Sequence, residues 1–168
     1  MVGNPVFSVS ETFYGKAGVV GMRIAIGCDH GALELKEEVK RVLAEYPEIE
    51  TADMGVYTPE AVDYPDMAVK VCAEITAGRA EQGILLCGTG IGISIAANKI
   101  PGIRAALCGD VYSAKMARQH NDANVLALGG RVLGFGVAGE ILRAWLSAAF
   151  AGGRHARRVE KIMALEGR

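Results

Sequence analysis

A cysteine stands directly before a glycine-rich loop in the segment Gly83 to Lys99, which reads GILLCGTGIGISIAANK. Apolar residues lead into Cys87, glycines follow at positions 88, 90 and 92, and an alanine-rich stretch continues after Ser94. This pattern predicts a buried strand, a tight loop and a helix. Backbone N–H groups of such a loop can converge on one point, and the helix start adds positive potential. The segment therefore predicts a site that stabilises an anion beside a potential base.

Cys87 has an alternative interpretation as a small buried hydrophobe, since buried cysteines are common and the chain has three others. Its place before the glycine loop and a helix start favours catalysis, because the thiol pKa should fall below about 8.5 there. Cys108 also ends a predicted strand, but no comparable glycine loop follows it. We interpret Cys108 and Cys72 as structural.

The glycine loop could alternatively bind a dinucleotide, with Asp110, about 20 residues further on, as the ribose-binding acid. That fingerprint needs a third glycine where the helix packs closely on the strand. Depending on the glycine from which the motif is counted, Ile93 or Ile95 occupies this position. The match to a dinucleotide site is therefore weak.

Three further polar residues have both a structural and a functional interpretation. Asp29 could cap a helix, and His30 beside it could be a turn residue that faces solvent. His120 falls near the end of a predicted helix, where the dipole favours the protonated form of histidine. Taken alone, a histidine in this position is more often structural than catalytic.

Basic residues crowd the start of the last predicted helix at Arg154, His155, Arg157 and Arg158. Exposed cations there oppose the helix dipole at a cost of roughly 0.3–1 kcal/mol each, so an anion should compensate them. A solvated basic face, salt bridges to a neighbouring subunit and a phosphate clamp all fit this cluster. Spacing alone does not choose among these three interpretations.

Composition sets the class of protein. A chain of 168 residues with 51% hydrophobic content can bury the core of one domain. A formal net charge of −1 gives no overall reason to bind nucleic acid or a membrane surface. The four cysteines show no CxxC spacing and no apolar run reaches about 18 residues, so we expect reduced thiols, no membrane span and a cytoplasmic protein.

The first 21 residues read differently from the rest. Lys16 is their first basic residue, and Pro5 and Glu11 interrupt the apolar character, which makes a poor signal peptide. Met22 is a plausible alternative initiator. We therefore expect an N-terminal extension, residues 1–21, either disordered or vector-derived, and a single domain at residues 22–168.

Strand and helix patterns alternate from Met22 onward. Five short apolar strands are predicted, at Arg23–Gly27, Glu48–Asp53, the run ending at Cys87, Ile103–Cys108 and Asn124–Leu128. Helices are predicted around Leu35–Tyr46, Asp66–Ala77, the stretch after Ser94, Val111–His120, Val137–Phe150 and a last helix after Gly153. Parallel strands need crossover connections, so the pattern predicts an α/β fold with three layers, α/β/α, around a five-stranded parallel sheet.

Ligands bind outside the carboxyl ends of the strands in an open sheet of this kind. Polar residues follow every predicted strand, namely Cys28, Asp29 and His30; Asp53; Cys87 to Gly92; Asp110; and Gly130 with Arg131. We expect the functional site at this edge of the sheet.

Six motifs occur in order along the chain: Gly27-Cys28-Asp29-His30-Gly31, Asp63-Tyr64-Pro65, Cys87 to Lys99, Gly102-Ile103-Arg104, Arg118 to Arg131 and Gly152 to Val159. With them, the chain resembles the ribose-5-phosphate isomerase B family from about Met22 to Glu166. The resemblance implies a Rossmann-like fold with a five-stranded sheet. The family also includes isomerases of galactose and allose 6-phosphates, so membership implies the reaction type more closely than the sugar.

The resemblance implies an enzyme of the pentose phosphate pathway, an intramolecular oxidoreductase that interconverts ribose 5-phosphate and ribulose 5-phosphate without metal or other cofactor. Cys87 matches the acid/base that moves a proton between C2 and C1 through a cis-enediolate. The oxyanion site of the family matches Gly88, Thr89, Gly90, Gly92 and Ser94. Another branch of the family uses a glutamate where this chain has Ile93, so the chain resembles the cysteine branch.

The resemblance also assigns the rest of the site. His120 matches the residue that opens the furanose ring, with Asp29 assisting and Asn121 beside it. Phosphate-binding positions match His30, Arg131, Arg154 and Arg158. Family sites are assembled from two subunits, which implies a homodimer, or a tetramer of dimers. Two alternatives stay open: an isomerase of a six-carbon sugar phosphate and a non-catalytic nucleotide- or phosphate-binding module.

Overall fold

Five parallel strands form one sheet in the computed structural model, which describes residues 21–166. The predicted extension, residues 1–21, lies outside the described residues except for Gly21. The strands are β1 (Met22–Cys28), β2 (Ile49–Asp53), β3 (Gln82–Cys87), β4 (Ala105–Leu107) and β5 (Val125–Gly129). Their order across the sheet is β2-β1-β3-β5-β4, and every neighbouring pair is parallel. The predicted α/β fold with a five-stranded parallel sheet is confirmed.

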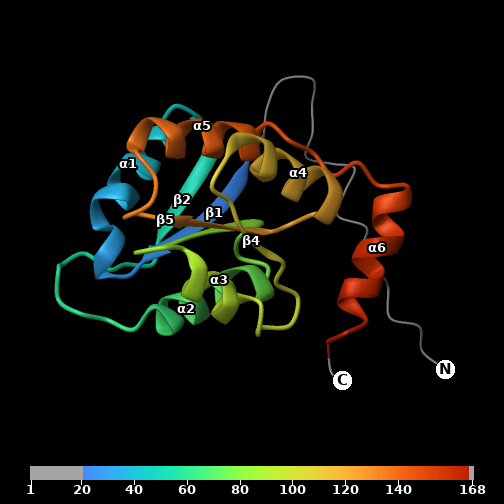
Figure 1. Ribbon diagram of the computed structural model, residues 1–168, viewed down its shortest axis with the longest axis horizontal. Helices are drawn as coiled ribbons and strands as arrows, with labels where there is room; N and C mark the ends of the chain where they lie inside the picture. Colours follow the sequence, from blue (N-terminus) through green and yellow to red (C-terminus); the bar gives the residue numbers. More distant parts are fainter. Residues whose placement is uncertain (1–20, 167–168) are drawn as a thin grey trace.

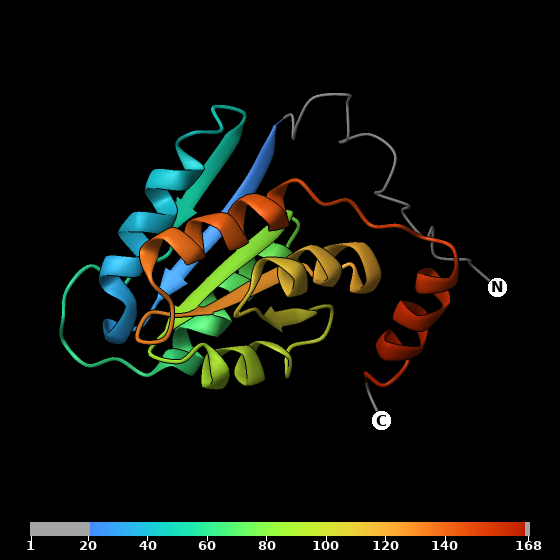
Figure 2. The same cartoon turned by 45° about the horizontal axis from the view of Figure 1, so that its top comes forward.

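Helices cover both faces of this sheet, which gives the three predicted layers (Figure 1). One face carries α1 (Leu33–Leu43), α4 (Val111–Asn121) and α5 (Phe135–Leu146). The other face carries α2 (Tyr64–Thr76) and α3 (Ile91–Ala97). The last helix, α6 (Arg154–Met163), stands beside these layers near α4 (Figure 2). None of the helices within residues 21–166 is both long and apolar enough to cross a bilayer.

Two hydrophobic cores lie on the two faces of the sheet. Ile24, Ile84 and Leu126 face α1, α4 and α5, whereas Ala25, Leu85 and Ala127 face α2 and α3. Every residue of β3 and β5 is buried. Both faces of the central strands are therefore apolar, which explains why these segments are continuous hydrophobic runs in the sequence.

Some element boundaries differ from the predicted ones. The strand predicted at Ile103–Cys108 is only Ala105–Leu107. In the turn before it, the Asn124 side chain accepts a hydrogen bond from the Arg104 N–H and donates one to the Gly102 carbonyl, so this backbone is held in the turn and does not extend the strand. The helix predicted at Val137–Phe150 is α5, which runs from Phe135 to Leu146. Beyond it, the Ala151 N–H donates to the Gln119 carbonyl at 2.9 Å, so the chain crosses to the end of α4 instead of continuing the helix.

Candidate active site

The connections reverse direction across the sheet between β1 and β3, and open α/β sheets bind ligands at this switch point. The Asp29 N–H donates to the Leu86 carbonyl at 3.0 Å, just beyond β1. On the other side of β3, the N–H of Gly130 donates to the Cys87 carbonyl at 2.8 Å. The residues that follow β1, β3 and β5 therefore lie side by side, as the sequence predicts.

The Cys87 thiol sits at the entrance of the glycine loop. Its Sγ accepts a hydrogen bond from the backbone N–H of Gly90 at 3.1 Å, and the residue is buried. Thr89 Oγ1 accepts from the Ile91 N–H at 3.3 Å, while the Ser94 hydroxyl donates to the Ile91 carbonyl at 2.8 Å. The Gly90 N–H is thus directed at the sulfur, and this contact holds the thiol beside the loop.

Glycine is required at position 90 for two reasons. Its φ of 76° lies in the left-handed region, and a Cβ there would come within 2.9 Å of the Leu128 carbonyl carbon. Gly129 is just as close to the loop, since a Cβ on it would lie 2.6 Å from the Thr89 carbonyl oxygen. The loop therefore packs directly on the end of β5, and this contact fixes its N–H groups.

Asp29 and Arg131 lie beside the same loop. Asp29 Oδ1 accepts from the Gly31 N–H at 2.8 Å and caps the short helical turn η1 (His30–Ala32). The interpretation of Asp29 as a helix cap is therefore confirmed. Arg131 extends between Gly31 and Gly88, because a Cβ on Gly31 would lie 3.4 Å from Arg131 Nη2. This arrangement places a cation beside the glycine loop, where it can attract a substrate anion.

Tyr64 lies against the start of α3, and it was not among the predicted site residues. A Cβ on Gly92 would come within 2.6 Å of the Tyr64 ring, so the aromatic side chain covers the start of α3. Tyr64 belongs to the Asp63-Tyr64-Pro65 motif, and Pro65 occupies the first turn of α2. The occurrence of Tyr64 in this motif was the sequence signal that could have assigned it to the site.

The remaining predicted site residues form a second cluster at the opposite end of the strands, where the strands begin. α4 starts after β4, runs back antiparallel to the strands, and ends at His120 and Asn121, shortly before β5 begins. A helix of this length spans about 16 Å, which carries its end to the edge where the strands start. In a single chain, the structure therefore does not bring His120 and Asn121 together with Cys87.

His120 instead contacts α6. Its ring stacks on that of His155 with centroids 4.1 Å apart and an angle of 4° between the planes. Arg154 Nε lies 3.5 Å from His155 Nε2, and Arg158 follows one helical turn later. Burial lowers the pKa of His155, and the positive charges of His120, Arg154 and Arg158 lower it further. The cluster is cationic and suited to a phosphate.

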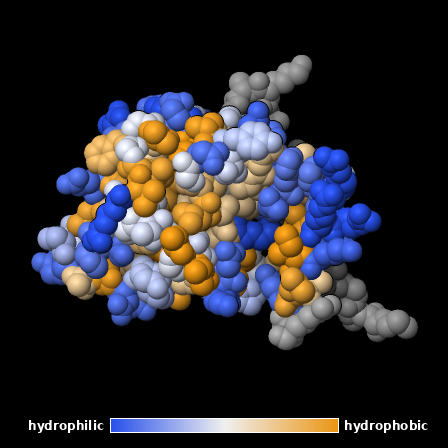
Figure 3. Space-filling model, viewed as in Figure 1, coloured by the Kyte–Doolittle hydropathy of each residue, from blue (hydrophilic) through white to orange (hydrophobic). Residues whose placement is uncertain are grey.

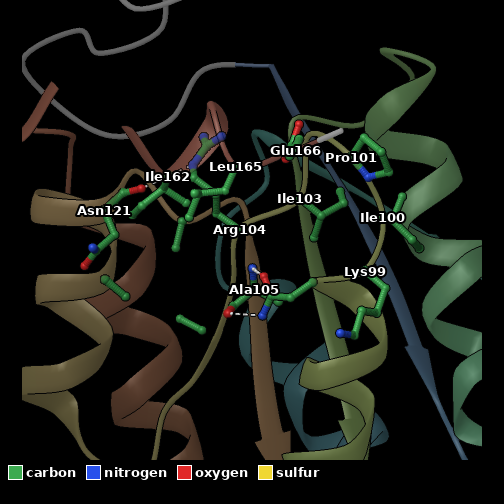
Figure 4. Close-up of a pocket in the computed structure, with 14 residues that line it drawn as sticks. Lys99, Ile100, Pro101, Ile103, Arg104, Ala105, Asn121, Ile162, Leu165 and Glu166 are labelled. Carbon is green, nitrogen blue, oxygen red and sulfur yellow. Dashed lines mark hydrogen bonds between the residues drawn. The ribbon is translucent and has the colours of Figure 1, made fainter. Parts of the chain in front are cut away.

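A cavity of about 680 Å³ opens beside this second cluster, between α3, β4, α4 and α6 (Figure 4). Arg104 lies across it and donates to Asp122 Oδ2 at 3.1 Å, while Ile162 and Leu165 line it from the α6 side. Asn121 is the single predicted site residue among those that line it. The cavity is therefore separate from the Cys87 loop.

The other three cysteines are also buried. Burial raises the pKa of Cys72 to about 12 and that of Cys108 to about 11, and it also raises the pKa of Cys28. These thiols stay protonated near neutral pH, which agrees with the structural interpretation of Cys72 and Cys108. Within residues 21–166, no group of three or more His, Cys, Asp or Glu side chains is placed to hold a metal ion.

Fold and site together place a buried thiol and a glycine-rich loop at the switch point of an α/β sheet. The chain belongs to the ribose/galactose isomerase family, whose model matches residues 24–162. Its enzyme class is therefore that of the sugar-phosphate isomerases.

Individual relatives align over nearly their whole length. Ribose-5-phosphate isomerase B of Escherichia coli strain K12 is 51% identical over 146 residues, which cover 87% of this chain and 97% of that protein. D-erythrulose-4-phosphate isomerase of Pectobacterium atrosepticum is 48% identical, covering 84% of this chain and 93% of that protein. The structure of ribose-5-phosphate isomerase B from Clostridium thermocellum superposes with a TM-score of 0.84 at 52% identity, over 86% of this chain and 97% of that one. The type B enzyme from Trypanosoma brucei gives 0.85 at 49% identity, over 88% of this chain and 100% of that one.

Proposed function

We propose that this enzyme interconverts ribose 5-phosphate and ribulose 5-phosphate, with Cys87 as the acid/base. The observation that supports this most directly is the Cys87 thiol at the switch point, with the Gly90 N–H directed at its Sγ from 3.1 Å. A relative with 51% identity carries the name ribose-5-phosphate isomerase B. A coupled assay of ribose 5-phosphate turnover by the purified chain is the direct test, and no turnover would overturn the proposal.

The chemistry follows from the loop. The Cys87 thiolate removes the proton from C2 of the open-chain aldose, and the electron pair forms the C1–C2 double bond as negative charge develops on O1. N–H groups in the segment Gly88 to Ser94 stabilise the resulting cis-enediolate. O1 gains a proton, O2 loses one, and the Cys87 thiol returns its proton to C1 to give the ketose. The reaction is redox-neutral and needs no co-reactant.

Ring opening requires a second group, since only the open-chain aldehyde can form the enediolate. We assign this step to His120 with Asp29 assisting and Asn121 beside them. The phosphate is assigned to His30, Arg131, Arg154 and Arg158. In one chain these residues divide between the two edges of the sheet, so a complete site needs the His120 cluster of a second copy beside the Cys87 loop of the first.

Two exposed apolar surfaces support such a pairing. One surrounds the Cys87 loop and consists of Ile91, Ile95, Leu107 and Tyr112, which are 43–72% exposed. The other consists of Ile162 and Leu165 at the cavity; Figure 3 shows hydrophobic side chains on the side of α6 toward the body of the molecule and hydrophilic ones on its outer side. In a two-fold dimer each surface of one copy meets the other surface of its partner, so both sites form together.

Mixing two impaired variants tests the shared site. Cys87→Ala and His120→Asn are each expected to turn over ribose 5-phosphate about a hundredfold more slowly than the wild type. If a site takes Cys87 from one copy and His120 from the other, random reassembly gives one intact site in each hybrid dimer, or about a quarter of wild-type sites for an equal mixture. Activity that stays at the sum of the separate variants would contradict a shared site.

The carbon number of the sugar is tested by comparing kcat/KM for ribose 5-phosphate, erythrose 4-phosphate, and allose and galactose 6-phosphates. The 48% identical erythrulose-4-phosphate isomerase is the reason to include a four-carbon sugar. The predicted alternative of a six-carbon substrate requires the largest kcat/KM for a 6-phosphate. Nucleotide binding by calorimetry without any isomerase activity would instead favour a non-catalytic module.

A further inference from the structure

Lys36 on α1 is fully buried, and the proposed reaction does not use it. Its Nζ donates to Asp53 Oδ1 at 3.0 Å and to the Val56 carbonyl at 2.7 Å, and it lies 4.5 Å from the centre of the Tyr57 ring. An ammonium group has three N–H donors, and here it has a carboxylate, a carbonyl and an aromatic face as partners. Burying an amine so completely is unfavourable unless it is satisfied in this way.

The partners of Lys36 all lie within residues 53–57, which begin at the last residue of β2, and this segment pairs with the end of β1. The Met54 N–H donates to the Ile26 carbonyl at 2.8 Å. The Cys28 N–H then donates to the Gly55 carbonyl at 3.0 Å, and the Val56 N–H returns to the Cys28 carbonyl at 3.3 Å. Lys36 therefore holds the segment that pairs with the end of β1, directly before Asp29 and His30.

The same loop returns to His30 a few residues later. The Val62 N–H donates to His30 Nδ1 at 3.3 Å, whereas residues 57–61 between the two contacts are exposed. An Nδ1 that accepts a hydrogen bond carries no proton, so the neutral ring has its proton on Nε2. This tautomer leaves Nε2–H as the donor available to a substrate oxygen.

We propose that Lys36 is a positioning residue: by fixing the 53–57 segment it sets the orientation and tautomer of His30, the proposed phosphate ligand. Lys36 acts on both sides of His30, through Cys28 in the preceding strand and through the loop that supplies the Val62 N–H. The phosphate role of His30 rests on the proposed function, whereas the effect of Lys36 on the His30 ring does not.

Lys36→Met is the direct variant, because methionine keeps the unbranched apolar stem as far as Cε while removing all three donors. Asp53 retains Lys40 Nζ at 2.9 Å from Oδ2 and the Gly55 N–H at 3.0 Å from Oδ1, so the variant leaves no isolated carboxylate. Lys40→Met is the matched control. It removes the other lysine from Asp53 but leaves the contacts to Val56 and Tyr57 in place.

The primary measurement is ¹⁵N NMR of labelled histidine without substrate, with the His30 signals assigned by His30→Gln. We expect the Nε2–H tautomer in the wild type and in Lys40→Met, and a mixture of tautomers in Lys36→Met. Val62→Pro removes the N–H at the other end of the loop and is expected to give the same mixture without touching Lys36. An unchanged His30 tautomer in a folded Lys36→Met variant would overturn the proposal; if that variant does not fold, an unchanged tautomer in Val62→Pro overturns it.

Kinetics give the second readout. Lys36→Met should raise KM for ribose 5-phosphate and the inhibition constant of inorganic phosphate by about tenfold, the scale of one hydrogen bond to a charged group, with a smaller change in kcat. A fall in kcat at unchanged KM would contradict a role in phosphate binding. If the wild-type chain does not turn over ribose 5-phosphate, the proposed function fails, while the tautomer comparison still decides the role of Lys36.

Discussion

The imidazole rings of His120 and His155 lie parallel, with their centroids 4.1 Å apart and 4° between their planes. His155 is the buried member of the pair, and burial followed by the charges of His120, Arg154 and Arg158 lowers its pKa. Two protonated rings at this separation would repel each other. The stack is therefore stable with His155 neutral.

This relationship predicts how stability depends on pH. Because the pKa of His155 is lower in the folded protein than the usual value of about 6.5, the unfolded chain binds more protons as pH falls through this range. We expect the contribution of His155 to the free energy of unfolding to be complete above about pH 7 and to be lost as pH falls below about 6.5. Urea denaturation of the wild type and His155→Gln at several pH values measures it. Plotted against pH, the free energies of unfolding of the two proteins should run parallel above about pH 7 and diverge below about pH 6.5. Equal slopes of the two plots below pH 6.5 would contradict the prediction.

Loss of the Cys87 thiol should remove catalysis without unfolding the protein. Cys87→Ala keeps the small apolar volume at the end of β3 but deletes the acceptor of the Gly90 N–H. We expect turnover of ribose 5-phosphate to fall at least about a hundredfold, as for removal of a general base. Cys72→Ala is the control, since burial raises that thiol's pKa to about 12 and it has no assigned chemical role. Near-normal turnover in folded Cys87→Ala would eliminate Cys87 as the base.

Replacing His120 should affect cyclic substrates selectively. Ribose 5-phosphate closes into a furanose, but erythrose 4-phosphate cannot, because the oxygen that would close its ring carries the phosphate. His120→Asn should therefore lower turnover of ribose 5-phosphate by about a hundredfold while largely preserving that of any erythrose 4-phosphate the wild type accepts. Lys115→Ala, an exposed position on the same helix, is the control. Equal losses on both substrates would argue against a role in ring opening.

A methyl group at position 90 should disrupt the loop itself. Gly90 has a φ of 76°, and a Cβ would lie 2.5 Å from Leu107 Cδ1 and 2.9 Å from the Leu128 carbonyl carbon. Gly90→Ala should destabilise the protein by at least about 1–2 kcal/mol and lower kcat, because the N–H directed at Cys87 moves. Gly136→Ala is the matched control. No heavy atom lies within 4 Å of its added Cβ in α5, so we expect about 0.5–1 kcal/mol of stabilisation. Equal stability of Gly90→Ala and the wild type would show that the loop can shift freely.

Sequence patterns were sufficient where the determining interactions are local. The apolar run into Cys87, the following glycines and the alanine-rich helix define strand, loop and helix within one short segment, and the alternation of such units predicts a parallel sheet. The carboxyl ends of parallel strands share one edge, so the proximity of Asp29, Cys87 and Arg131 could also be predicted. Boundaries were less predictable, as at β4, where the Asn124 side chain shortens the strand from a distant position in the chain.

Only the tertiary structure decided where the two groups of predicted site residues lie relative to each other. His120 and Cys87 belong to one set of motifs, yet α4 returns across the sheet and carries His120 to the opposite edge, because a crossover helix must run antiparallel to its strands. The burial of Lys36 was likewise not visible in the sequence, since its partners Asp53 and Val56 reach it only through the pairing of β2 with β1. The sequence by itself determined the Cys87 loop, since its strand, turn and helix depend on neighbouring residues. Packing between distant segments decided which charged groups meet, and within one chain it keeps the loop and the His120 cluster apart.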